Sequence, residues 1–131
     1  MLKREVASGP AGRVVLMDSI TLVTADDTGA IIVSGSHGGT SSGTFALEVP
    51  LALVVFNDAG VGKDHAGIAA LPMLQARGVP GCTLAHTSAR IGDALDMWEH
   101  GVISHVNAAA RSLGIRPGQA LAAVLRRLVA R

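Results

Sequence analysis

Three Gly-rich polar turns hold nearly all of the side chains in this chain that could do acid–base or binding chemistry. They span residues 34–40, 57–64 and 86–93, and each follows a short apolar run typical of a buried strand. In an open parallel sheet, the turns that follow the strands gather along one edge, which is where ligands bind. The sequence therefore predicts one site, assembled from the three turns at the carboxyl ends of the strands.

The first turn combines one histidine with several small residues. Its glycines allow backbone N–H groups to approach a ligand closely, which favours a site for a carboxylate or a phosphate. His37 is the candidate proton-transfer group of this turn. Residues 39–43 also match the G-x-S-x-G pattern of a hydrolase nucleophile, but they lie six residues past the strand, and a full hydrolase sheet does not fit in 131 residues. An anion-binding turn is therefore the favoured interpretation.

The second turn contains Lys63 together with Asp58 and Asp64. It comes close to the phosphate-loop pattern but has Asn57 where that pattern needs Gly, and Asp64 where it needs Ser or Thr, so it does not predict a nucleoside triphosphatase. Lys63 could pair with an anionic substrate or act as a base if it is desolvated. The alternative is a surface lysine beside an aspartate that caps a helix. Asp58 follows a strongly apolar run and is expected at the sheet edge as a polarising or orienting group.

The third turn contains His86, Ser88, Arg90 and Asp93. Arg90 is the best anchor for a carboxylate or a phosphate, because a planar guanidinium binds such groups through two hydrogen bonds. A salt bridge to Asp93 or to Asp96 would explain the same arginine without a ligand. Ser88 could likewise cap a helix instead of binding a substrate.

These turns define two sets of candidate site residues. The catalytic candidates are His37, Lys63 and Asp58. The substrate-binding candidates are Ser36, Gly38, Gly39, Thr40, Asn57, Gly60, Gly62, His86, Ser88, Arg90 and Asp93. The five histidines lack the short spacings of a metal site, and no motif for an organic cofactor is present, so we expect neither a metal nor a cofactor.

Composition limits the function further. Hydrophobic residues make up 49% of the chain and charged residues only 16%, which favours a homo-oligomer, with a coding bias towards Ala, Gly and Val as the alternative. The net charge of +1, without a basic stripe or stacking aromatics, argues against nucleic acid as a partner. No apolar run is long enough to span a membrane and no signal-peptide pattern is present, so we expect a cytoplasmic protein. The single cysteine, Cys82, lies in an apolar run and is expected to be a buried, inert thiol.

The elements that must position the three turns alternate between strands and helices. Strands are expected at residues 14–17, with 20–23 as an extension, and at 31–33, 51–56 and 82–86. Helices are expected at residues 44–48, at 64–77, as one long helix at 91–113, and after Pro117. The apolar stripe of the long helix runs straight through Gly101. Polar residues 1–12 are expected to form a loosely ordered arm, with an antiparallel edge added to the sheet by the first thirty residues as the alternative.

The pattern predicts one α/β domain over residues 1–131, built as a three-layer α/β/α sandwich around a mostly parallel, Rossmann-like sheet of four or five strands. The function that it favours is a small cytoplasmic enzyme that acts on a small anionic metabolite by hydrolysis or elimination. Two alternatives stay open. One is a non-catalytic anion-binding or regulatory module, and the other is a subunit of a larger enzyme whose site is completed by another chain.

Overall fold

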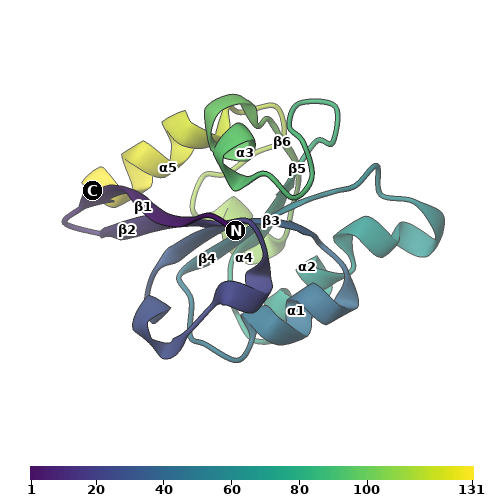
Figure 1. The fold of residues 1–131 in the computed structure, drawn as a ribbon, viewed down its shortest axis with the longest axis horizontal. Coiled ribbons are helices and arrows are strands. Elements are labelled where there is room, and N and C mark those ends of the chain that lie inside the picture. The colour runs from purple at the N-terminus through teal and green to yellow at the C-terminus, as the bar shows by residue number, and fades with distance from the viewer.

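A six-stranded mixed sheet runs through the computed structural model, which describes residues 1–131 (Figure 1). Its strands follow the chain order across the sheet, and are β1 (Lys3–Gly9), β2 (Gly12–Met17), β3 (Ile31–His37), β4 (Leu53–Asn57), β5 (Gly81–Leu84) and β6 (Ile103–Val106). Strands β2 to β5 are parallel, whereas β1 and β6 pair antiparallel at the two edges. The predicted α/β class is confirmed, but the sheet has six strands and not four or five, and its antiparallel edge strands distinguish it from the Rossmann-like sheet that we expected.

Helices cover both faces of the sheet. The connections between β2 and β5 carry η1 (Ile20–Leu22), η2 (Ala25–Asp27), α1 (Thr40–Ala46), η3 (Lys63–Ile68) and α2 (Ala70–Ala76). Because right-handed crossovers between successive neighbours lead to one face, α1 and α2 pack side by side there. The opposite face is covered by α3 (Ala94–His100) and α5 (Leu121–Ala130), while α4 (Ala108–Ser112) lies against β5 (Figure 1).

Two hydrophobic clusters fill the space on either side of the sheet. Along β3, Ile31 and Val33 pack towards α3 and α5, whereas Ile32 packs towards α1 and α2. The central strands are therefore continuously apolar because both of their faces are buried. No helix of the protein combines the length and the apolar character needed to cross a membrane.

The first residues form the edge strand β1 and not a loose arm, which corrects our expectation. Gly9 pairs with Gly12 at the end of a tight hairpin, and the Leu2 N–H donates to the Asp18 carboxylate at 2.8 Å. Lys3 adds an ion pair of 2.9 Å with the buried Asp27. Most side chains of this strand are polar because only part of one face packs on the core, so an apolar pattern could not reveal it. Strand β2, which covers the strand predicted at residues 14–17, is consequently internal.

The long helix predicted for residues 91–113 is wrong, because the segment is divided into α3, β6 and α4. The break occurs at Gly101, whose backbone is extended at φ −62° and ψ 136°. A methyl group on Gly101 would overlap the Met97 carbonyl oxygen and the Leu84 side chain. The chain therefore passes close to β5 at this point and continues as the strand that pairs with it.

Three further boundaries differ from the sequence expectations. Residues 20–22 form a helical turn and do not extend the preceding strand, because the Ser19 hydroxyl accepts a hydrogen bond from the Thr21 N–H. The predicted helix over 64–77 is divided into η3 and α2, and Pro72 lies in the first turn of α2, where a missing N–H is tolerated. The final helix is confirmed, although it begins at Leu121 and not near Pro117. The expected homo-oligomer stays a prediction, because the structure describes a single copy of the chain.

Candidate functional site

Asp58 lies at the centre of a cluster of polar and titratable groups. Its side chain lies just past the carboxyl end of β4 and is only 6% exposed. One oxygen, Oδ1, accepts hydrogen bonds from the N–H groups of Gly60 at 2.8 Å and His86 at 3.1 Å. Burial raises the pKa of this carboxyl, but these N–H groups and the Ser104 hydroxyl outweigh burial and lower the pKa below its usual range. Asp58 is therefore a carboxylate at neutral pH.

Two histidines face the two oxygens of this carboxylate. The Nδ1 atom of His86 lies 3.4 Å from Oδ1 of Asp58, and the Nδ1 atom of His105 lies 3.9 Å from Oδ2. The histidine side chains are 55% and 41% exposed, respectively. Neither Nε2 atom has a hydrogen-bond partner within the protein. Each ring therefore has one nitrogen towards a buried charge and the other nitrogen free for chemistry.

A β-bulge in the edge strand brings His105 and Ser104 to the same place. Thr83 pairs with His105 and Leu84 pairs with Ile103, so Ser104 is the extra residue in β6. As a result the Thr83 hydroxyl contacts both the Ser104 hydroxyl, at 2.9 Å, and His105 Nδ1, at 3.4 Å. The Ser104 hydroxyl also lies 3.2 Å from His105 Nδ1. Neighbouring residues of a regular strand point to opposite faces, whereas a bulge redirects one of them, often beside an active site.

The loop that follows Asp58 is held in an unusual backbone conformation. Ala59 and Val61 have φ of +50° and +66°, in the left-handed region that costs such residues on the order of 1 kcal/mol or more each. The loop is closed at its base, where the Val61 N–H donates to the Asp58 carbonyl and the Gly67 N–H donates to the Val61 carbonyl, both at 2.7 Å. A methyl group on Gly67 would overlap the Asp58 carbonyl oxygen, so only glycine fits there. Strain of this kind is concentrated at functional sites.

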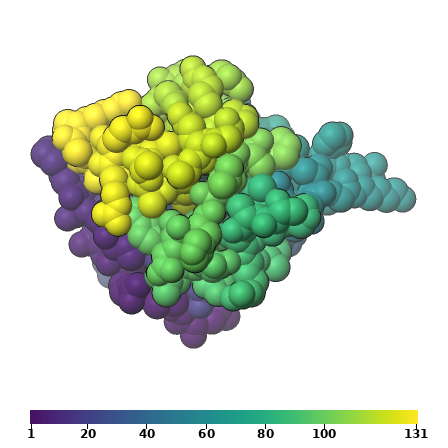
Figure 2. Space-filling model, turned by 90° about the horizontal axis from the view of Figure 1, so that it is seen from above, coloured from purple at the N-terminus to yellow at the C-terminus, as the bar shows by residue number.

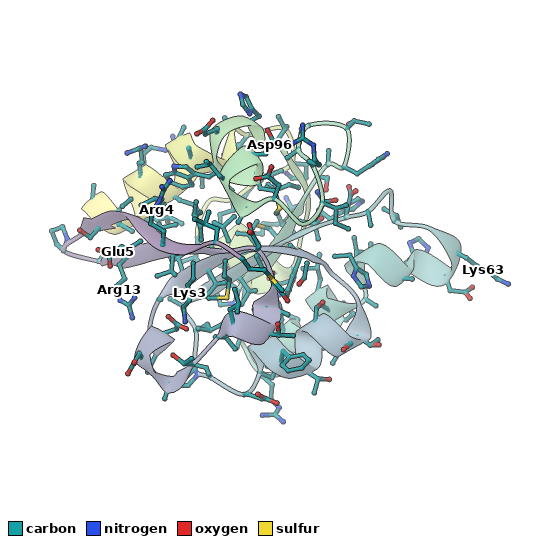
Figure 3. All side chains as sticks on the ribbon, viewed as in Figure 1. Lys3, Arg4, Glu5, Arg13, Lys63 and Asp96 are labelled. Atoms are coloured by element: carbon teal, nitrogen blue, oxygen red, sulfur yellow. The ribbon has the colours of Figure 1, made fainter.

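Lys63 lies at the outer end of the same loop, away from the cluster. The segment near residue 60 protrudes from the body of the molecule (Figure 2), and Lys63 extends from its tip into solvent (Figure 3). No carboxylate pairs with this lysine. The expectation that Lys63 joins the other turn residues is corrected, because the loop closes through its backbone at Gly67 and directs its tip outward.

His37 is exposed at the end of β3, where it pairs in register with Asn57. It lies at the predicted carboxyl edge of the parallel strands, but no contact joins its ring to Asp58, His86 or His105. The structure therefore brings Asp58 and His86 together as the sequence predicted, and leaves His37 outside this cluster.

Several predicted binding groups hold the loops together. Asn57 is fully buried, donates to the Ala89 carbonyl at 3.0 Å and accepts from the Ala59 N–H at 2.9 Å. Ser88 donates to the Ala85 carbonyl and accepts from the Val102 N–H, which ties the third turn to the start of β6.

In the first turn, the Ser36 hydroxyl accepts from the Ile20 N–H, and the Gly38 N–H donates to the Asn57 carbonyl. Gly39 caps α1 and Thr40 is its exposed first residue. In the second turn, Gly62 is exposed on the protruding loop.

Arg90 makes the salt bridge that the sequence offered as the alternative to ligand binding. Its Nη1 atom lies 3.1 Å from the Asp93 carboxylate, and its side chain is 75% exposed. Asp93 also caps α3 by accepting from the Asp96 N–H, and Asp96 accepts from the backbone N–H of Arg90. These contacts account for Arg90 and Asp93 without a ligand.

A groove of about 490 Å³ lies beside the cluster, between α2, β6 and α4. Ser104 and His105 line it, together with apolar side chains that include Leu71 and Val106, and with Arg111. Ser104, His105 and Arg111 are not among the predicted site residues, because the sequence pattern places residues 102–113 within one helix, and Thr83 lies inside a predicted buried strand. No local signal could have found them, since the bulge and the pairing with β5 are tertiary features. No group of three or more His, Cys, Asp or Glu side chains is arranged to hold a metal ion.

Comparison with known proteins finds no family model, no curated protein and no solved structure that matches this chain.

Proposed function

We propose that this protein is an enzyme in which Asp58 and two histidines carry out general acid–base catalysis on a small anionic substrate. One observation carries the proposal. A nearly buried carboxylate lies 3.4 Å from the Nδ1 atom of His86 and 3.9 Å from the Nδ1 atom of His105, and both rings are partly exposed. Carboxylate–imidazole pairs of this type orient the histidine in hydrolytic enzymes.

The carboxylate acts most directly on His86, since the Nδ1 atom of His105 also has the Ser104 hydroxyl at 3.2 Å and the Thr83 hydroxyl at 3.4 Å. A negative charge next to Nδ1 favours the tautomer that carries its proton on Nδ1, which leaves Nε2 free to accept a proton. The same charge stabilises the imidazolium that forms when Nε2 becomes protonated. The distances are long for hydrogen bonds in the free protein, and catalytic contacts commonly shorten when the substrate binds.

Two histidines on one carboxylate allow a base and an acid to act in the same turnover. In hydrolysis, one Nε2 takes a proton from water while the other histidine gives a proton to the leaving group. In an elimination, the base takes the proton from carbon and the acid protonates the departing oxygen. Both reactions belong to the hydrolase and lyase classes that the sequence favours.

The test is a turnover assay with a panel of small carboxylate esters, phosphate monoesters and hydroxy acids. Asp58→Asn should lower kcat by roughly 100-fold or more, because it removes the charge that stabilises the imidazolium. Asp64→Asn is the matched control, since Asp64 is exposed on the same loop. His37→Ala should retain activity if the Asp58-linked histidines transfer the proton, and should lose it if His37 does.

A second readout does not depend on knowing the substrate. Nitrogen-15 NMR of the imidazole rings should show the Nδ1–H tautomer at His86, and Asp58→Asn should shift the ring towards a mixture of tautomers. The proposal is wrong if no compound of the panel is turned over, or if Asp58→Asn and Asp64→Asn behave alike in both measurements.

A further inference from the structure

We propose that the groove between α2, β6 and α4 binds the substrate, and that this substrate has a carboxylate or phosphate group on a compact apolar body. The inference rests on the proposed function, because His105, one of the two histidines that would act on the substrate, lines one part of this groove. Ser104 and His105 belong to the Asp58 cluster and also face the groove. The cluster therefore opens onto this groove.

The size and lining of the groove indicate the body of the ligand. A space of about 490 Å³ lies within the usual range for small-molecule sites. Leu71 and Pro72 of α2 line it on one side, and Val106 lines it on the β6 side. These surfaces favour an apolar body of a few carbon atoms or a single ring, since burial of apolar area drives its binding.

The charge of the lining indicates the polar end of the ligand. None of the residues that line the groove is an aspartate or a glutamate, whereas Arg111 lines it from α4. No carboxylate pairs with Arg111, so its guanidinium is available for a bidentate interaction with an anion. Gln75 adds an amide N–H₂ group without a hydrogen-bond partner in the protein, and its Oε1 atom accepts from the Ala109 N–H at 2.8 Å.

The walls of the groove are held in place before any ligand binds. Asn107 lies between them and is almost fully buried. Its side chain accepts from the N–H groups of Gly81 and Ala110, and donates to the carbonyls of Val79 and Leu71. It therefore connects α2, β5 and α4. A preformed groove loses little conformational entropy when a ligand enters.

The binding experiment uses phenyl phosphate and benzoate as probes, with benzamide as the neutral control. In two-dimensional NMR of the wild-type protein, both anions should shift the amide signals of Ser104, His105 and Val106. Arg111→Gln should weaken the binding of the anions roughly tenfold, as expected for the loss of a charge-assisted contact. Arg77→Gln should leave binding within about twofold, because Arg77 is exposed at the end of α2 and does not line the groove.

The outcomes separate this inference from the proposed function. Binding in the groove that depends on Arg111, without turnover of any compound, would overturn the catalytic proposal and leave the groove assignment standing. Turnover that depends on Asp58 but is unchanged in Arg111→Gln would overturn the groove assignment and leave catalysis standing. Signal shifts outside the groove, equal effects of the two arginine variants, or equal affinity for benzamide would also overturn the groove assignment.

Discussion

Replacement of Asn107 by alanine should lower the free energy of unfolding by about 3 kcal/mol, because this one side chain makes four hydrogen bonds while only 8% of the residue is exposed. Its Oδ1 atom accepts from the N–H groups of Gly81 and Ala110, both at 3.0 Å. Its Nδ2 atom donates to the carbonyls of Val79 at 3.0 Å and Leu71 at 3.3 Å.

The magnitude follows from what each lost bond leaves behind. Loss of the bond to the Ala110 N–H removes the N-cap of α4, which costs about 1 kcal/mol. The buried N–H of Gly81 loses its acceptor, which costs about 1 to 2 kcal/mol. The carbonyls of Val79 and Leu71 lose a donor and add roughly 0.5 kcal/mol, since each oxygen can accept elsewhere. A loss of this size should lower Tm by roughly 10 °C in a chain of this length.

Urea denaturation measures this change directly. The single tryptophan, Trp98, is buried in the core and reports unfolding through its fluorescence. Ser112→Ala is the matched control from the same helix, because the exposed Ser112 hydroxyl donates only to the Ala108 carbonyl. The control should change the free energy of unfolding by less than about 0.5 kcal/mol. A loss below about 1 kcal/mol in Asn107→Ala would refute the assignment of Asn107 as the link between α2, β5 and α4.

Two further predictions concern titratable groups. The Cys82 thiol is fully buried, and burial raises its pKa to about 12. A thiol-specific reagent should therefore label Cys82 only as fast as the protein opens. Rapid labelling of the native protein would contradict this prediction. Burial raises the pKa of Asp27, but the Thr24 N–H and the Lys3 ammonium outweigh burial and lower this pKa below 3.8. The ionised Asp27 therefore stabilises the folded protein above pH 3.8, and this stabilisation is lost as the pH falls through the folded-state pKa. The free energy of unfolding should therefore decline in acid, and Asp27→Asn should reduce this decline in urea titrations at several pH values, whereas Asp26→Asn, at an exposed neighbour, should not.

The candidate site was predictable where it depends on strands that the sequence marks clearly. Asp58 and His86 follow the apolar runs of β4 and β5, and parallel strands end at the same edge of a sheet. Their proximity could therefore be expected from local pattern alone. The outward position of Lys63 could not be expected from local pattern, because the direction of a loop depends on how its base closes. Here it closes where Gly67 lies against the Asp58 carbonyl.

The other half of the site was not predictable from local sequence, because residues 91–113 were expected to form one helix. Residues 91–113 have apolar positions at helical spacing, and the sequence contains no residue between them that forbids a helix. Gly101 ends α3 only because its backbone lies against Leu84 of another strand. The bulge at Ser104 then depends on pairing with β5. Neither contact is encoded within the segment that it reshapes.

The sequence by itself determined the α/β class, the buried strands β3 to β5 and the amphipathic helix α5, because continuous apolar runs and 3.6-residue periodicity are local properties. It also determined that Asp58 and His86 would lie at the carboxyl edge of those strands. Only the tertiary structure decided that β6 pairs antiparallel with β5, and that Ser104 and His105 meet Thr83 beside Asp58. The physical reason is that strand pairing and close backbone packing join residues far apart in the chain, and these contacts outweigh the local preference of residues 91–113 for a helix.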